Sequence, residues 1–261
     1  MRNNLSQLIS LSKIEEKLYR PADAYELSRV TRMEHVKTTI VETPQEGIAA
    51  VAARIAQLIN RREANGQKTV LSLASGRSMR DLFVELVRLH KEEGLSFKNV
   101  VVFGSYEFYP LSDTTSGSMA QIQSQLLEHV DILPENLHTF PGDLPKEDVF
   151  AFCEEYEKAI VEAGGIDVQV LGIGQCGNIA MNEPGTQPNS STRLVIMDGN
   201  SRVDVKSLFG NVAQVPTCAI TLGVETILQA KEVILLAFGQ HKAGIVKQAI
   251  EEVANAACPA S

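Results

Sequence analysis

Short apolar runs alternate with helical patterns along most of this 261-residue chain, and this alternation constrains the fold more than any other feature. Seven apolar runs predict strands, at residues 38–42, 69–73, 99–103, 166–171, 194–197, 219–222 and 233–238. Six stretches with apolar residues three or four apart predict helices, at residues 47–63, 79–93, 121–129, 149–162, 224–229 and 242–253. We therefore expect an α/β fold: a doubly wound, mostly parallel sheet with helices on both faces, Rossmann-like and in a single domain.

The first 37 residues lack this regularity. They are mixed and charged, with four apolar residues spaced as in a short helix: Leu5, Leu8, Ile9 and Leu11. No internal repeat, low-complexity tract or long Pro/Gly/Ser linker divides the rest of the chain. We expect an N-terminal extension over residues 1–37 and one α/β domain over residues 38–261.

The composition narrows the class of protein and its partners. With 44% hydrophobic and 21% charged residues, the chain can bury a large core. Its net charge of −8 disfavours nucleic acid and anionic membrane surfaces as main partners. The N-terminus lacks a signal-peptide pattern and no apolar run approaches the roughly 20 residues of a membrane span, so we expect a cytoplasmic protein. The four cysteines lack paired metal-ligand spacing, which predicts reduced thiols and no structural zinc.

Two loops carry the chemistry that the sequence suggests. The first, at residues 73–79, precedes a helical pattern, so its small residues can present N–H and hydroxyl groups to an anion at a helix N-terminus. The second, at residues 172–185, ends in the carboxylate of Glu183. An anion site beside a positioned carboxylate predicts chemistry on a phosphorylated small molecule.

A third loop is predicted at residues 104–110, after the apolar run at 99–103. In an open parallel sheet, ligands bind beyond the carboxyl ends of the strands, and all three loops fall at such ends. We therefore expect the three loops to converge on one pocket.

Several motifs follow one another in a distinctive order. They are the three loops, residues 95–103, Asn182-Glu183-Pro184, and residues 191–193, 200–202, 219–223 and 239–243. From about residue 38 to the end, this ordered set resembles the glucosamine-6-phosphate deaminase/isomerase family. The resemblance implies an enzyme that opens a sugar ring, moves a proton between C2 and C1, and releases ammonia from C2. It implies no metal and no organic cofactor.

The resemblance also implies a site for the substrate's phosphate group. Its residues would be Ser75, Gly76, Arg77, Ser78, Arg193, Arg202 and Lys242. Family members usually continue past a Pro-Ala-Ser like residues 259–261, so the resemblance implies a domain cut from a longer protein, fused to a further C-terminal domain. Related proteins range from monomers to hexamers, which leaves homo-oligomerisation open.

The chain departs from the family pattern at the acid–base groups. Where the family has an Asp-Glu pair, with Asp as the base that moves the C2 proton, this chain has Tyr106-Glu107. Where the family has Asp-Gly-His, with His assisting ring opening, it has Cys176, Gly177 and Asn178. Glu183 is retained. Arg77 stands where the family has a small residue, and would either add charge to the phosphate site or crowd it.

Each candidate catalytic residue also has a structural interpretation. Glu183 either takes part in catalysis or caps a turn. Tyr106 is a poor proton acceptor, since a phenol has a pKa of about 10, and is expected to pack or donate a hydrogen bond. Glu107 could act as the base only if its side chain turned into the pocket. Cys176 is either a nucleophile or a small buried apolar side chain, and Asn178 cannot transfer protons as histidine does.

The cationic residues have a structural interpretation too. Arg202 and Lys242 are either phosphate ligands or solvated surface charges. A lysine at the start of a helix is unfavourable for the helix dipole unless an anion compensates, which favours a phosphate role for Lys242.

Three functions remain compatible with these residues. The first is a deaminase/isomerase acting on an amino-sugar 6-phosphate. The second is a non-catalytic sugar-phosphate-binding or regulatory domain, because the phosphate elements are present while two acid–base groups are replaced. The third is a 6-phosphogluconolactonase-like hydrolase, which Asn182-Glu183-Pro184 and the missing histidine fit poorly.

Overall fold

The computed structural model describes residues 21–111 and 113–261. The chain forms two compact units, of which the first ends at Glu34 and the second begins at His35. In the described part of the first unit, helix α1 (Ala24–Val30) begins after Asp23, whose carboxylate accepts a hydrogen bond from the Glu26 N–H at 2.8 Å. An acidic N-cap of this kind satisfies an N-terminal N–H group that has no partner inside the helix. The short helix predicted around Leu5 to Leu11 lies outside the described residues.

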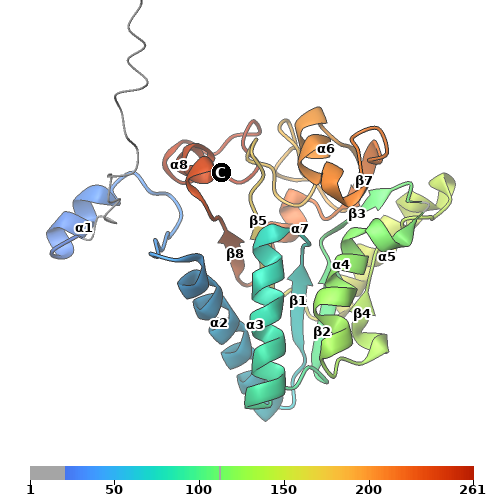
Figure 1. Ribbon diagram of the computed structural model, residues 1–261, viewed down its shortest axis with the longest axis horizontal. Coiled ribbons are helices and arrows are strands. Elements are labelled where there is room, and N and C mark those ends of the chain that lie inside the picture. The colour runs from blue at the N-terminus through green and yellow to red at the C-terminus, as the bar shows by residue number, and fades with distance from the viewer. Residues whose placement is uncertain (1–20, 112) are drawn as a thin grey trace, which may run out of the picture. The chain divides into compact units, whose positions relative to one another are not determined.

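The second unit is built on a five-stranded parallel sheet with the order β4-β2-β1-β5-β8. The strands are β1 (Thr69–Leu73), β2 (Val100–Gly104), β4 (Leu137–His138), β5 (Val168–Gly172) and β8 (Val233–Leu236). The central strand β1 pairs Thr69 with Val100 on one side and Leu71 with Val168 on the other. The predicted parallel sheet is confirmed, and β1 and β8 point toward the end where α6 and α8 lie (Figure 1).

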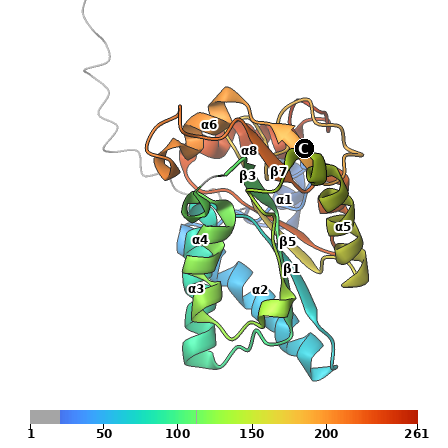
Figure 2. The same cartoon turned by 90° about the vertical axis from the view of Figure 1, so that its right-hand side faces the viewer.

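Helices cover both faces of this sheet, as predicted. Because successive strand residues face opposite sides, Leu71 and Leu73 pack with the buried faces of α2, α3 and α4, while Val70 packs with α5. Figure 2 shows α3 and α4 on one side of β1 and α5 on the other. These helices span Pro44–Ala64 (α2), Arg77–Glu93 (α3), Ser118–Gln125 (α4) and Val149–Glu162 (α5).

A second, antiparallel sheet of three strands lies beside the first, with the order β3-β7-β6. Its strands are β3 (Tyr106–Tyr109), β6 (Arg193–Ile196) and β7 (Cys218–Thr221). The prediction of one sheet, with residues 104–110 as a loop, is wrong here. All four residues of β3 are buried, so the strand shows no apolar–polar alternation, and only Ser105 separates it from β2.

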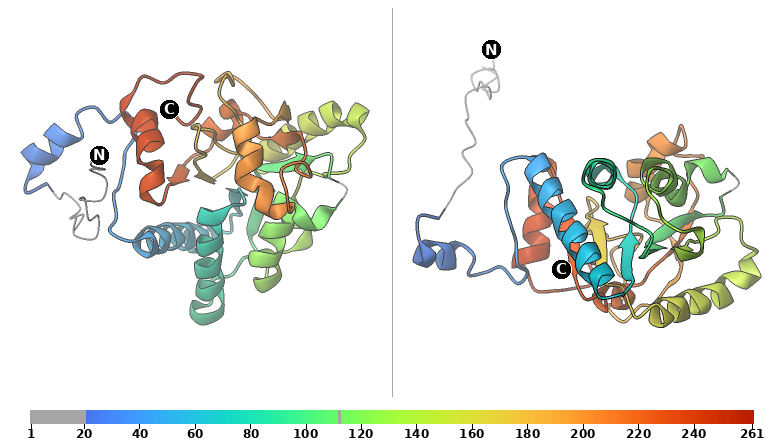
Figure 3. Two further views of the ribbon diagram at one scale, coloured as in Figure 1. Left: turned by 45° about the horizontal axis from the view of Figure 1, so that its top comes forward. Right: turned by 90° about the horizontal axis from the view of Figure 1, so that it is seen from below.

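Three shorter helices complete the described part of the second unit, and Figure 3 shows two of them, the orange α6 and the red α8, from other directions. They are α6 (Gly199–Val205), α7 (Val224–Leu228) and α8 (Ala243–Glu251). Short 3-10 turns lie at Thr114–Ser116, Leu127–His129, Pro134–Asn136, Lys146–Asp148, Lys206–Leu208 and Gln240–Lys242.

Three predicted elements differ from the structure. The run at 38–42 forms no strand, and its Ile40 is 68% exposed, because an apolar run becomes a strand only with a hydrogen-bonded neighbour. The helix predicted at 121–129 is α4 followed by a 3-10 turn, and the helix predicted from Lys242 begins one residue later, after another 3-10 turn. No helix in the described residues is long and apolar enough to cross a membrane.

Candidate active site

The anion loop, residues 74–78, connects β1 to α3. Gly76 precedes the first residue of α3 with φ +135°, and no side chain caps this helix end. Ser75 and Ser78 are half-buried, whereas Gly76 and Arg77 are exposed. Uncapped N–H groups at the start of a 17-residue helix, flanked by two hydroxyls, suit the binding of an anion.

Tyr106 contacts this loop directly. Its hydroxyl lies 2.8 Å from Ser75 Oγ, within hydrogen-bond distance, and its ring packs edge-to-face on Phe108. Only 7% of Tyr106 is exposed, and burial raises the pKa of its phenol. The group beside the anion loop is therefore a neutral hydroxyl, as expected for tyrosine at this position.

Glu107 faces away from the anion loop toward α4. Its Oε1 accepts hydrogen bonds from the N–H groups of Phe108 and Ser118 at 2.8 Å each, and its Oε2 accepts one from Met119 N–H at 2.9 Å. A Cβ at Gly117 would lie 2.8 Å from Glu107 Oε2, so only glycine allows this approach. Burial raises the pKa of the carboxyl against the effect of these three bonds. The condition for a base role, a side chain turned into the pocket, is not met.

The start of α6 holds the Glu183 side chain through both carboxylate oxygens. Ser201 Oγ donates to Oε2 at 3.0 Å and the Asp198 N–H donates to Oε1 at 3.3 Å. Asn178 Nδ2 in turn donates to Ser201 Oγ at 3.5 Å. The structure thus brings together Asn178 and Glu183, two of the predicted residues, through Ser201, which belongs to the motif at residues 200–202 but had no predicted role.

Burial raises the pKa of the Glu183 carboxyl, and the negative charges of Asp198 and Asp204 act in the same direction. Between the ordinary pKa and this higher one, the folded protein binds more protons than the unfolded chain, so stability falls as pH rises through that window. Replacing Glu183 with Gln removes this penalty. We expect the melting temperature of Glu183→Gln, relative to the parent, to be higher at pH 7 than at pH 4; a constant difference would contradict the raised pKa.

Cys176 and the cationic residues are dispersed around this loop. Cys176 is half-buried with Asn200 Nδ2 at 3.8 Å from its Sγ. Arg202 donates from Nη2 to the carbonyls of Val212 and Val215 at 3.0 and 2.9 Å, so that atom is occupied by backbone. Lys242 ends the 3-10 turn after β8, at the same edge of the sheet as the anion loop. Among the described residues, no cluster of His, Cys, Asp and Glu could hold a metal ion.

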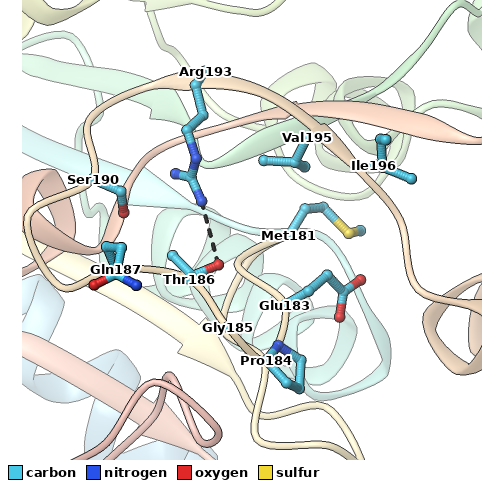
Figure 4. A pocket seen from close by; sticks show the side chains of 10 residues that line it. All are labelled: Met181, Glu183, Pro184, Gly185, Thr186, Gln187, Ser190, Arg193, Val195 and Ile196. Carbon is cyan, nitrogen blue, oxygen red and sulfur yellow. Dashed lines mark hydrogen bonds between the residues drawn. The ribbon is translucent and has the colours of Figure 1, made fainter.

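Arg193 and Glu183 line one cavity of about 400 Å³ (Figure 4). Arg193 donates from Nη2 to Thr186 Oγ1 at 3.3 Å and from Nη1 to the Ser191 carbonyl at 3.1 Å. Within residues 21–111 and 113–261, it pairs with no carboxylate, and burial lowers its pKa. The cavity therefore contains a positive charge and a carboxylate that do not neutralise each other directly.

Strand β7 joins the two loops. Tyr106 pairs with Thr221 across the β3–β7 ladder, and Thr221 Oγ1 accepts a hydrogen bond from the Met181 N–H at 3.2 Å. Asn182 Nδ2 also donates to the Leu222 carbonyl at 2.8 Å. Residues 221 and 222 at the end of β7 thus contact the Glu183 loop, and β7 pairs with Tyr106, which in turn touches the anion loop. The cavity of Glu183 is lined by no residue of the anion loop, so the predicted convergence of the three loops on one pocket is not seen in this cavity.

The chain matches the family described as glucosamine-6-phosphate isomerases/6-phosphogluconolactonase over residues 42–261. It belongs to this family. The match confirms the family that the order of motifs indicated.

Relatives of known sequence agree with this membership. A protein named "Putative glucosamine-6-phosphate deaminase-like protein" from Bacteroides thetaiotaomicron is 44% identical over 262 residues, covering 100% of this chain and 40% of that protein. The chain thus spans less than half the length of that relative. Glucosamine-6-phosphate deaminase of Caenorhabditis elegans is 35% identical over 215 residues, covering 81% of this chain and 80% of that protein.

Solved structures of family members share the architecture. A monomeric glucosamine-6-phosphate deaminase superposes with a TM-score of 0.80 at 32% identity, covering 86% of this chain and 91% of that one. A 6-phosphogluconolactonase from Trypanosoma brucei has a TM-score of 0.65 at 22% identity, covering 85% and 89%. The second likeness establishes the common fold alone.

Proposed function

We propose that this chain binds an amino-sugar 6-phosphate between the anion loop and Glu183, and that it lacks the groups needed to isomerise and deaminate it efficiently. The observation that carries the proposal is the 2.8 Å contact between the Tyr106 hydroxyl and Ser75 Oγ. It puts a phenol beside the anion loop at the position where the family's pattern has the aspartate base.

Of the acid–base positions in the family's pattern, only Glu183 still carries a group that can transfer a proton at the site. The phenol of Tyr106 has a pKa raised by burial, the amide of Asn178 does not titrate, and Glu107 is held by backbone N–H groups of β3 and α4. Each positioned acid or base contributes roughly 10² to 10⁴ in rate, so the loss of two removes most of the catalysis. Glu183 is the carboxylate that remains in the cavity.

The groups that could bind a phosphate are present in larger number than the groups that could transfer a proton. The anion loop offers uncapped N–H groups and two serine hydroxyls, with Arg77 exposed beside them. Lys242 lies at the same edge of the sheet, and Arg193 supplies a guanidinium in the cavity of Glu183. A phosphate dianion is recognised by such N–H groups and cations together.

A second candidate function is slow deamination that depends on Glu183 alone. It is favoured by the raised pKa of this carboxyl, because a group that titrates nearer to neutral pH can both accept and donate a proton. Loss of ammonium release in Glu183→Gln would separate this function from binding.

The proposal predicts a phosphate-dependent thermal shift. At a concentration of 100 times Kd, glucosamine 6-phosphate stabilises the folded state by about 2.7 kcal/mol, which raises the melting temperature by about 5–10 °C. Glucosamine without phosphate gives no shift, and Ser75→Ala weakens the response whereas Ser207→Ala, on an exposed turn, does not. Equal shifts with both sugars, or none with either, contradict the proposed site.

Ammonium release measured on the same samples tests the catalytic half of the proposal. We expect none above the Glu183→Gln background. Release that disappears in Glu183→Gln would replace the binding function with the slow deaminase.

A further inference from the structure

The hydroxyl of Ser201 is buried between two residues of the Glu183 loop. Ser201 lies in the first turn of α6, and only 7% of it is exposed. Its Oγ is 3.0 Å from Glu183 Oε2 and 3.5 Å from Asn178 Nδ2. Thus α6 supplies a side chain that contacts the Glu183 loop at two places, Asn178 in its middle and Glu183 near its end.

The chemistry of the three groups fixes the direction of these hydrogen bonds. An ionised carboxylate only accepts, a side-chain N–H₂ group only donates, and a hydroxyl donates once and accepts. The chain therefore runs from Asn178 through Ser201 to Glu183. The Asp198 N–H donates to the other carboxylate oxygen at 3.3 Å, so the two oxygens of Glu183 are each assigned one donor.

We propose that Ser201 is the positioning residue of Glu183: its hydroxyl fixes the orientation of the carboxylate at the cavity and favours its ionised form. This inference rests on the proposed function only in that Glu183 faces the ligand there. Ser201 itself contacts no ligand in this proposal, and it acts through the carboxylate that it holds.

The charges around Glu183 determine how strongly the Ser201 hydroxyl affects the ionisation of this carboxyl. Asp198 and Asp204 both oppose ionisation of Glu183, whereas Arg193 lines the same cavity and is the cation there. Among the groups that contact the carboxylate, the Ser201 hydroxyl and the Asp198 N–H favour the ionised form. Removal of the hydroxyl leaves burial and the two aspartates opposed by one donor, so the pKa of Glu183 has to rise.

The test is a carbon-13 NMR titration of the Glu183 side-chain carboxyl in the chain without ligand, with the resonance assigned by its loss in Glu183→Gln. In Ser201→Ala the titration midpoint is expected to rise by about one pH unit, the size of one hydrogen bond to a charged group. Ser201→Thr, which keeps the hydroxyl, restores the parent midpoint. Ser207→Ala, at an exposed serine on the turn after α6, leaves it unchanged.

If Ser201→Ala does not fold, Ser201→Cys replaces it, because a thiol of similar size is a weak donor and the midpoint should still rise. A parent-like midpoint in the folded Ala or Cys variant overturns the inference, as does a raised midpoint in Ser201→Thr.

The affinity for glucosamine 6-phosphate is measured on the same proteins. Because Ser201 acts only through the ionisation of Glu183, we expect the affinity of Ser201→Ala to fall up to about tenfold at pH values below the parent midpoint and to equal that of the parent well above the raised midpoint. If the parent chain binds no sugar phosphate, the proposed function fails, while the titration still decides the role of Ser201.

Discussion

A variant that combines Tyr106→Asp, Cys176→Asp and Asn178→His is expected to release ammonium from glucosamine 6-phosphate at least about 10²-fold faster than the Glu183→Gln background, which the parent chain is not expected to exceed. The three changes restore the acids and bases that the family pattern has at these positions. An aspartate at 106 puts a carboxylate beside Ser75, where the Tyr106 hydroxyl now lies at 2.8 Å. A histidine at 178 lies within reach of Ser201 and, through it, of Glu183.

The neighbourhood of these positions supports the gain. Asn178 lies directly against Gly174, where a Cβ would approach its Oδ1 to 1.8 Å, so the absence of a side chain at 174 leaves space for the group at 178. A histidine there titrates near neutral pH, which the present amide cannot do. Rate measurements at saturating substrate therefore report the restored proton transfers.

The controls for this experiment are the three single variants and the triple variant with Glu183→Gln. Each single variant should release ammonium more slowly than the triple variant, and adding Glu183→Gln to the triple variant should abolish the increase in rate. A triple variant that folds and binds the sugar phosphate but releases no more ammonium than its Glu183→Gln form would show that this site does not support deamination.

Replacing Glu107 with Ala is expected to lower the free energy of unfolding by about 3–5 kcal/mol, because three buried N–H groups lose their acceptor at about 1–3 kcal/mol each, with partial relaxation. For the second unit this corresponds to a drop of roughly 6–20 °C in melting temperature. Urea unfolding measures the loss, with the change in midpoint as the readout.

The matched controls separate the acceptor role from general effects. Glu128→Ala removes an exposed carboxylate on the turn that follows α4 and should change stability by less than about 0.5 kcal/mol. Glu107→Gln keeps one acceptor oxygen but turns an N–H₂ group toward a backbone donor, so its loss should be intermediate. Equal stability of Glu107→Ala and Glu128→Ala would contradict the proposed anchoring of α4.

The central sheet could be predicted because its strands are continuous apolar runs separated by amphipathic helices. Leu71, Val100 and Val168 belong to such runs and lie on neighbouring parallel strands. The strand β3 could not be predicted in this way, because its four residues are buried on both faces and a single residue separates it from β2. Periodicity reports burial on one face of an element, and this strand has no exposed face.

The site was only partly predictable for a related reason. The sequence singled out Ser75, Tyr106, Asn178 and Glu183, and the structure brings them together in two pairs. It did not indicate that Ser201 links the second pair or that Arg202 is held by the carbonyls of residues 212 and 215. Those contacts depend on how α6 and the loop after it fold back, which local patterns do not encode.

The adjacency of Tyr106 and Glu107 on β3 has a consequence for how such a site can be redesigned. Successive residues of a strand face opposite sides, so the side chain at position 106 contacts the anion loop while that at position 107 accepts hydrogen bonds from the start of α4. A residue beside the anion loop and a residue that stabilises α4 are therefore neighbours in the chain but lie on opposite faces of β3. The side chain at position 106 can be exchanged without disturbing the hydrogen bonds of Glu107, provided that no residue is inserted or deleted in the strand.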